Sequence, residues 1–156
     1  MTTATLESIY NQVNADFLSL GIQTGSVTKL SWNGRFKNVN GRCKRRGDEY
    51  QIEISKMFLD RPDEVRKTMA HEILHTVDGC FNHGDKFHEL AQTLKKCGYN
   101  ITTKRHVDYT DDDYPYVMEC NCCGSKVRNF KKTDFFKNPD RWICGKCKKS
   151  DWTRIK

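Results

Sequence analysis

Apolar side chains recur every three or four residues near the start of the chain, which is the period of an amphipathic helix. Gly21 and Gly25 interrupt this pattern. We therefore predict a helix over residues 5–20 that packs one face on a core. The apolar positions of this helix are Leu6, Ile9, Tyr10, Val13, Phe17 and Leu20.

Residues 27–58 have a different pattern, in which apolar and polar side chains are separated by short turns. Asn-Gly pairs at 33–34 and 40–41 and an Arg-Gly pair at 46–47 mark these turns. Such dipeptides favour hairpin connections between neighbouring strands. The pattern predicts a three-stranded antiparallel meander.

A second helix is predicted to begin at Pro62. Proline suits the first helical turn, and the acidic Asp63 and Glu64 suit its positive end. The apolar period continues until Gly79, where we expect the helix to stop. The apolar positions of this helix include Val65, Met69, Ile73 and Val77.

A third helix follows, with Asn82 or Asp85 as its cap and Gly98 at its end. Residues 99–114 are irregular and acidic in part, so we interpret them as a linker or a lid over a cleft. A cysteine-rich module then occupies residues 115–156. The apolar face of the third helix is Phe87, Leu90, Ala91 and Leu94.

The composition is that of a globular protein with one domain, or one domain and a small appendage. The chain has 156 residues, of which 37% are hydrophobic and 30% charged. It has no apolar run near the ~20 residues that a membrane span requires, and its N-terminus lacks a signal peptide's pattern. We therefore expect an intracellular protein, in the cytoplasm or nucleoid or in a nucleus, that is neither secreted nor membrane-bound.

Cysteine spacing near the C-terminus predicts a structural zinc site. In a reducing compartment, clustered cysteines bind metal more often than they form disulfides. Cys120 and Cys123 form one CxxC pair and Cys144 and Cys147 form another, with 20 residues between the pairs. Two such pairs complete a tetrahedron of thiolates. Cys122 could replace either neighbour or remain free, although the CxxCG form favours Cys120 and Cys123.

Residues 71–75 form an HExxH sequence inside the second predicted helix. Residues four apart share a helix face, so His71 and His75 can bind the same zinc ion. Glu72 can then accept a proton from a water molecule as that water attacks a peptide carbonyl group. A surface helix with two hydrogen-bonded histidines is the alternative, but the apolar flank of this helix argues against it.

A catalytic zinc ion usually has three protein ligands and one open position. His83 and His88 are the candidates for the third ligand, and five residues of helix separate them by about 140° around the axis. They are therefore not expected to serve one metal. His83 follows the turn at Gly79, where the chain must fold back, so we favour His83 and interpret His88 as a surface residue.

These residues together resemble the SprT-like family, whose pattern is HExxH followed after a short loop by HGxxF. The resemblance covers nearly the whole chain. It implies an α+β fold, with a zincin-like metalloprotease domain in residues 1–114 and a β-rich zinc ribbon in residues 115–156. It also implies His83 as the third ligand and Glu72 as the general base. The matching segments are Trp32, Gly41-Arg42-Cys43, Ile52-Glu53-Ile54-Ser55, the HExxH sequence and His83-Gly84-Asp85-Lys86-Phe87.

Positive charge suggests a nucleic-acid partner. The net charge is +7, and residues 115–156 alone carry 11 Lys/Arg against 4 Asp/Glu. Residues 29–46 add seven basic residues without an acid. An ordinary solvated basic surface is the alternative. The candidate contacts to DNA, which we expect to be single-stranded or to have unpaired ends, are Arg42, Lys44, Arg45, Arg46, Lys126, Arg128, Lys131, Lys132, Arg141 and Trp142.

The sequence thus predicts a monomeric zinc-dependent endopeptidase with two zinc ions, one catalytic and one structural. Well-studied members of the resembling family degrade proteins crosslinked to DNA, which implies DNA-bound proteins as substrates. One alternative is a DNA-binding or transcription-associated zinc protein with little turnover, against which Glu72 argues. Another is a zinc hydrolase of a non-protein substrate, which Glu72 would serve equally well.

Overall fold

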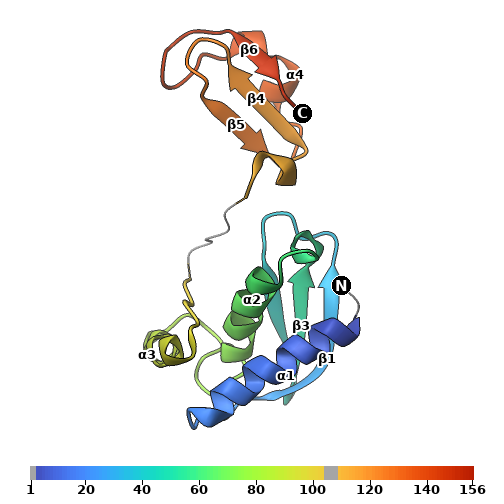
Figure 1. Cartoon of the computed structure of the whole chain (residues 1–156), viewed down its shortest axis with the longest axis vertical. Coiled ribbons are helices and arrows are strands. Elements are labelled where there is room, and N and C mark those ends of the chain that lie inside the picture. Colours follow the sequence, from blue (N-terminus) through green and yellow to red (C-terminus); the bar gives the residue numbers. More distant parts are fainter. Residues whose placement is uncertain (1–2, 104–108) are drawn as a thin grey trace. The chain divides into compact units, whose positions relative to one another are not determined.

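The computed structural model describes residues 3–103 and 109–156 of the chain. The chain divides into two compact units, Met1–Val107 and Asp108–Lys156 (Figure 1). Each unit contains a three-stranded sheet together with helices, so the fold is α+β as predicted. None of the described helices combines the length and the apolar character that crossing a membrane requires.

The division between the units lies at residues 107 and 108, whereas the sequence led us to expect it after residue 114. The ring centroids of Tyr109 and Tyr114 lie 5.5 and 4.5 Å from that of Phe130. These contacts make residues 109–114 part of the second unit. Residues 104–108 of the predicted linker or lid lie outside the described residues.

The sheet of the first unit has the strand order β1-β3-β2. β1 (Ser26–Asn33) runs parallel to β3 (Glu49–Ser55), whereas β2 (Gly41–Arg46) runs antiparallel to β3. The predicted antiparallel meander is therefore wrong, because the third strand lies between the other two.

Side-chain burial explains the central place of β3. Its residues Tyr50, Ile52 and Ile54 are buried, and a central strand is covered by a neighbour on each side. β2 is rich in arginine and lysine, which suit an edge strand because their charge discourages pairing with other chains. Gly47, with a φ of 62°, forms the short turn that joins β2 directly to β3.

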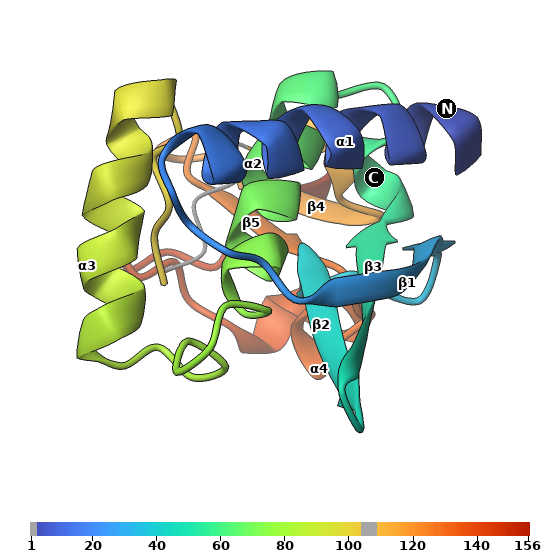
Figure 2. The same cartoon turned by 90° about the horizontal axis from the view of Figure 1, so that it is seen from below.

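Helices cover one face of this sheet. α1 (Thr3–Ser19) and α2 (Pro62–Leu74) pack against the strands, and α3 (Asp85–Leu94) contacts α2. Both views place α2 between α3 and the sheet (Figure 2). The largest fully buried side chains, from all of these layers, include Leu6, Phe17, Ile52, Ile54, Phe58, Met69, Ile73 and Phe87.

α2 ends at Leu74, short of the predicted stop at Gly79. The Thr76 hydroxyl donates to the Ile73 carbonyl oxygen at 2.7 Å and accepts from the Gly25 N–H at 2.9 Å. Such a side-chain bond competes with continuation of the helix. The first four residues of the HExxH sequence therefore form the last turn of α2, and His75 is its C-cap. The chain turns back at Gly79, whose φ is 77°.

The second unit is a small antiparallel sheet in which β4 (Tyr116–Cys120) lies between β5 (Lys126–Asn129) and β6 (Trp152–Arg154). α4 (Asp134–Lys137) follows β5. The third helix of the first unit continues as a short 3₁₀ turn and ends at Gly98, as predicted. The described 3₁₀ helices are η1 (Lys56–Phe58), η2 (Lys95–Cys97), η3 (Asp111–Asp113) and η4 (Pro139–Arg141).

Candidate metal centres

Three histidines of the first unit face one another. The Nε2 atom of His71 lies 3.2 Å from that of His75 and 3.1 Å from that of His83. The Nε2 atoms of His75 and His83 are 3.1 Å apart. The turn at Gly79 returns the chain, so that His83 reaches the end of α2 from just before α3. His88 is exposed and lies outside this group.

The geometry of this group suits a zinc ion. Nitrogens that share a tetrahedral zinc ion at about 2.0–2.1 Å lie about 3.3 Å apart, close to the distances above. Metal ligation requires neutral imidazoles, and burial lowers the pKa of all three histidines. For His71 the neighbouring charges of His75 and His83 add to burial, and its pKa falls to about 4.

Backbone carbonyl groups orient two of the imidazoles. His75 Nδ1 lies 3.0 Å from the Cys80 carbonyl oxygen, and the Thr102 backbone forms a hydrogen bond with His71. A carbonyl acceptor holds the proton on Nδ1 and leaves Nε2 unprotonated toward the metal position. These supporting groups are not visible in the sequence, because every residue carries a backbone carbonyl.

Phe87 lies against all three histidines. Its ring centroid is 5.2 Å from that of His71, 4.9 Å from that of His75 and 4.8 Å from that of His83. The side chain is fully buried in α3. The Phe87 ring therefore packs against the three imidazole rings and limits their rotation. In the sequence, Phe87 is marked only by its place on the apolar face of the third helix and by the HGxxF match.

Glu72 is a buried acid, 6% exposed, next to the first histidine. Burial raises the pKa of Glu72 to about 8, whereas a hydrogen bond with the Cys43 backbone and the charge of Arg42 act in the opposite direction. A zinc ion on the adjacent histidines would favour the carboxylate further. With the ion bound, Glu72 would be a carboxylate, the form that accepts a proton.

Gly41 allows β2 to approach this acid closely. A Cβ atom at Gly41 would lie 2.6 Å from Thr68 Cγ2 and 3.1 Å from Glu72 Cγ. No side chain fits at these distances without movement of β2 or α2. The glycine thus lets the edge strand place its backbone against Glu72.

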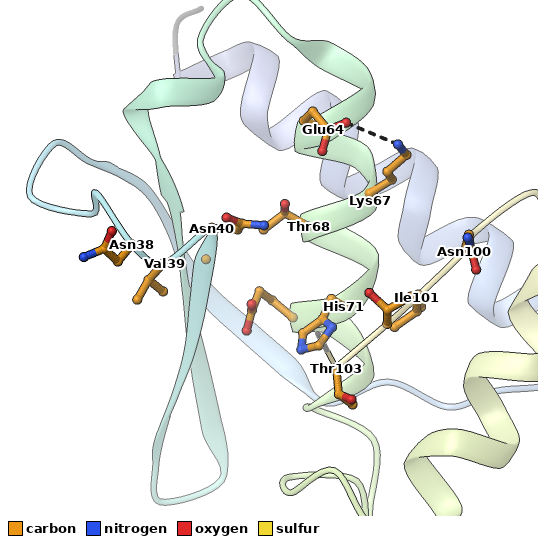
Figure 3. Close-up of a pocket in the computed structure, with 13 residues that line it drawn as sticks. Asn38, Val39, Asn40, Glu64, Lys67, Thr68, His71, Asn100, Ile101 and Thr103 are labelled. Carbon is orange, nitrogen blue, oxygen red and sulfur yellow. Dashed lines mark hydrogen bonds and ion pairs between the residues drawn. The ribbon is translucent and has the colours of Figure 1, made fainter. Parts of the chain in front are cut away.

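A cavity of about 390 Å³ opens beside His71 and Glu72. Residues 38–41 line one of its walls and residues 100–103 line another, with α2 between them. Figure 3 shows Asn38 and Val39 on one side of His71, and Asn100 and Ile101 on the other. The first part of the predicted linker or lid, residues 100–103, therefore borders the candidate active site.

The four predicted cysteine ligands come together in the second unit, with all their Sγ atoms within 4.8 Å of one another. Cys120 Sγ lies 3.5 Å from Cys147 Sγ, and Cys123 Sγ lies 3.6 Å from Cys144 Sγ. Sulfurs around a tetrahedral zinc ion at about 2.3 Å are about 3.8 Å apart. Cys122 is exposed and outside the group, in agreement with the CxxCG interpretation.

Strand geometry separates the candidate DNA contacts on β2. Alternation places Arg42, Lys44 and Arg46 on one face and Arg45 on the other. Lys44 Nζ forms a salt bridge with Glu53 Oε2 at 3.0 Å. The basic run is therefore not one continuous surface, and one of its charges is matched by a neighbouring acid.

An acid also matches two basic candidates on β5. Lys126 Nζ lies 2.5 Å from Asp111 Oδ2, and Arg128 Nε donates to the other carboxylate oxygen. These hydrogen bonds lower the pKa of Asp111. Asp111 thus engages two of the side chains that were predicted to contact DNA.

The remaining candidates of the second unit are exposed. Lys131, Lys132 and Arg141 form no ion pair with other described residues. Trp142 is 47% exposed, and its backbone carbonyl accepts the Trp152 indole N–H at 2.9 Å. These four side chains are available to a partner in a way that Lys126 and Arg128 are not.

The fold and the two groups of side chains define an α+β protein with two candidate metal centres. The family model of the SprT-like family matches residues 6–106. The chain therefore belongs to the SprT-like family.

Similarity to individual relatives is low but extends over most of the chain. Human germ cell nuclear acidic protein is 24% identical over 134 residues, which are 78% of this chain and 19% of that protein. The relative named Protein SprT-like from Bacillus cereus is 24% identical over 124 residues, and the one from Bacillus anthracis is 25% identical over 126. Each alignment covers 77% of this chain and 78% of the bacterial relative. The chain thus spans about a fifth of the human relative and most of the bacterial ones.

Proposed function

We propose that this protein is a zincin-like, zinc-dependent endopeptidase that cleaves proteins bound or crosslinked to DNA. The observation that carries the proposal is the buried Glu72 beside three converging imidazoles, at the border of an open cavity. A purely structural metal site would need neither the carboxyl group nor the cavity.

His71, His75 and His83 would hold the catalytic ion, and the four clustered cysteines would hold a structural one. Zinc supplies Lewis acidity, which polarises a carbonyl oxygen and makes water a better nucleophile at neutral pH. Glu72 accepts the proton of the attacking water and returns it to the leaving amine nitrogen.

The substrate chain is proposed to lie beside β2. Among the described residues this strand pairs only with β3, so the backbone groups of its other edge form no strand pairing, and one of them, at Cys43, bonds Glu72. Gly41 and the preceding residues 38–40 also line the cavity. An extended peptide can add to such an edge by main-chain hydrogen bonds, which do not depend on substrate sequence.

DNA association is supported by the net charge of +7 and by the exposed basic side chains of the second unit. An exposed indole such as that of Trp142 can stack on an unpaired base. Membership of the SprT-like family supports the same proposal.

A cleavage assay tests the function. Wild-type protein and Glu72→Gln are incubated with a DNA-binding protein, with and without single-stranded DNA. The amide of glutamine hydrogen-bonds water but accepts no proton, so we expect cleavage to fall at least ~100-fold. Glu89→Gln, on the exposed face of α3, is the matched control and should cleave like wild type.

Three results would overturn parts of the proposal. Strong cleavage by Glu72→Gln would exclude Glu72 as the base. DNA binding by wild type without cleavage would favour a DNA-binding zinc protein. Hydrolysis of small esters or amides, with proteins left intact, would favour a hydrolase of another substrate class.

A further inference from the structure

Tyr99 carries a buried phenol that the proposed chemistry does not use. The residue is 3% exposed. Its hydroxyl group donates to Asp16 Oδ2 at 2.5 Å and accepts from Arg66 Nη2 at 3.0 Å. Burial, together with the bond to Asp16, raises the pKa of Tyr99, so the phenol stays a protonated donor at neutral pH.

These bonds join three parts of the first unit. Asp16 belongs to α1 and Arg66 to α2, while Tyr99 follows the turn at Gly98 that ends the third helical region. The Arg66 guanidinium also lies over the Tyr99 ring, 5.5 Å from its centroid. Tyr99 is therefore fixed to both helices by its ring and by its oxygen.

The chain directly after Tyr99 forms a wall of the candidate active site. Residues 100–103 line the cavity opposite residues 38–41. Thr102 also forms the backbone hydrogen bond that orients His71. Thr102 is the third residue after Tyr99, so the two lie within about 10 Å of each other along even an extended chain. Tyr99 bonds side chains of both α1 and α2, through Asp16 and Arg66, directly before this wall begins.

We propose that Tyr99 is a positioning residue, which fixes residues 100–103 through Asp16 and Arg66 and thereby sets the orientation of His71 and the width of the substrate cavity. This inference rests on the zinc site of the proposed function. Groups that orient a metal ligand typically change metal affinity by ~10–100-fold when removed.

A purely structural role for the phenol makes a different prediction. Tyr99→Phe removes one oxygen atom and keeps the ring between the helices. The side chains of Asp16 and Arg66 are 36% and 39% exposed, so water can replace the lost bonds. A structural role would therefore change thermal stability and leave zinc affinity at the histidine site unchanged.

Metal binding distinguishes the two roles without a proteolysis assay. Zinc affinity of the full chain is measured by competition with a chromophoric chelator, and the cobalt-substituted protein is examined by absorption spectroscopy. The thiolate site serves as an internal reference, because its intense sulfur-to-cobalt bands are separate from those of a histidine site. Tyr10→Phe is the matched control, since this phenol makes no hydrogen bond among the described residues.

For Tyr99→Phe we expect the histidine site to bind zinc ~10-fold more weakly or worse. We also expect altered cobalt bands at the histidine site and unchanged bands at the thiolate site. Where proteolysis is measurable, KM should rise because the cavity wall is no longer fixed. Wild-type zinc affinity and an unchanged cobalt spectrum in Tyr99→Phe would overturn the inference.

Asp16→Ala removes the acceptor of the Tyr99 hydroxyl group on α1. This variant replaces Tyr99→Phe in the test if Tyr99→Phe does not fold. It should weaken zinc binding at the histidine site in the same way, and wild-type affinity would overturn the inference. The two proposals can fail separately. If the wild type cleaves no protein, the proposed protease function is refuted. If Tyr99→Phe still binds zinc more weakly at the histidine site, the inferred role of Tyr99 is retained.

Discussion

At the scale of single residues, the contacts on the far side of each imidazole matter as much as those that face the metal. The Cys80 and Thr102 backbones hold His75 and His71, and Phe87 lies beneath both rings. A ligand arranged in advance loses less freedom when the ion binds. The order of this site therefore depends on residues that carry no metal-binding group.

His83→Ala should reduce the bound zinc from two ions to one per chain, because two histidines alone bind zinc weakly. Metal analysis after dialysis measures this. His88→Ala should keep both ions, since His88 is exposed and outside the group. The reverse pattern would show that the chosen third ligand is wrong.

Cys122, the cysteine of the second unit that lies outside the group of four, allows a similar comparison of two variants. Cys123→Ser should lose the structural zinc and destabilise the unit, since a small module relies on its metal for folding energy. Cys122→Ser should retain zinc, because this thiol is exposed and outside the cluster. Loss of zinc from both variants would mean that Cys122 takes part in binding.

At the scale of elements, the close approach of β2 to α2 joins the sheet to the candidate catalytic acid. The edge position of β2 leaves backbone groups on its outer side, and one of them, at Cys43, forms a hydrogen bond with Glu72. A strand in the centre of the sheet would have both edges paired. The order β1-β3-β2 is therefore what brings an unpaired strand edge to the candidate active site.

Gly41→Ala should disturb this contact. The new Cβ atom would lie 2.6 Å from Thr68 Cγ2, and Thr68 is buried in α2. Overpacking of this kind costs about 1–3 kcal/mol of unfolding free energy, and we expect a lower melting temperature with reduced cleavage. Gly34→Ala is the control, because its Cβ meets only the flexible Lys56 side chain, at 3.3 Å. Equal melting temperatures and activities for the two variants would contradict the importance of this approach.

At the scale of the whole molecule, positive charge is not equally available to a partner. Lys126 and Arg128 are paired with Asp111, whereas Lys131 and Lys132 are exposed and unpaired among the described residues. Net charge alone does not distinguish these two groups. Only the unpaired side chains can bind phosphate without first losing an acidic partner.

The double change Lys131→Glu with Lys132→Glu should therefore weaken binding of a labelled single strand. Each lost phosphate contact should also flatten the dependence of log K on log salt by about 0.7. Lys95→Glu with Lys96→Glu is the matched control, on an exposed part of the first unit. Both variants change the net charge from +7 to +3, because each Lys→Glu change subtracts two. Equal weakening in both would mean that overall charge, and not a surface of the second unit, drives binding.

The sequence by itself determined the features that depend on short separations along the chain. Helical spacing places His71 and His75 on one face, and each CxxC pair places two thiols on one turn. Strand alternation also follows directly from the covalent backbone, so the faces of β2 could be assigned once its limits were known. The position of Gly79 predicted correctly that the chain would turn back after α2.

Tertiary structure alone decided the features that depend on distant residues. The sequence did not show that β3 would lie between β1 and β2, because turn residues specify a connection but not the neighbour of each strand. The support of His71 by Thr102, the bonds of Tyr99 to Asp16 and the pairing of Lys126 with Asp111 leave no periodic pattern. They arise when the packing of helices and strands brings separate segments together, and no local spacing encodes that packing.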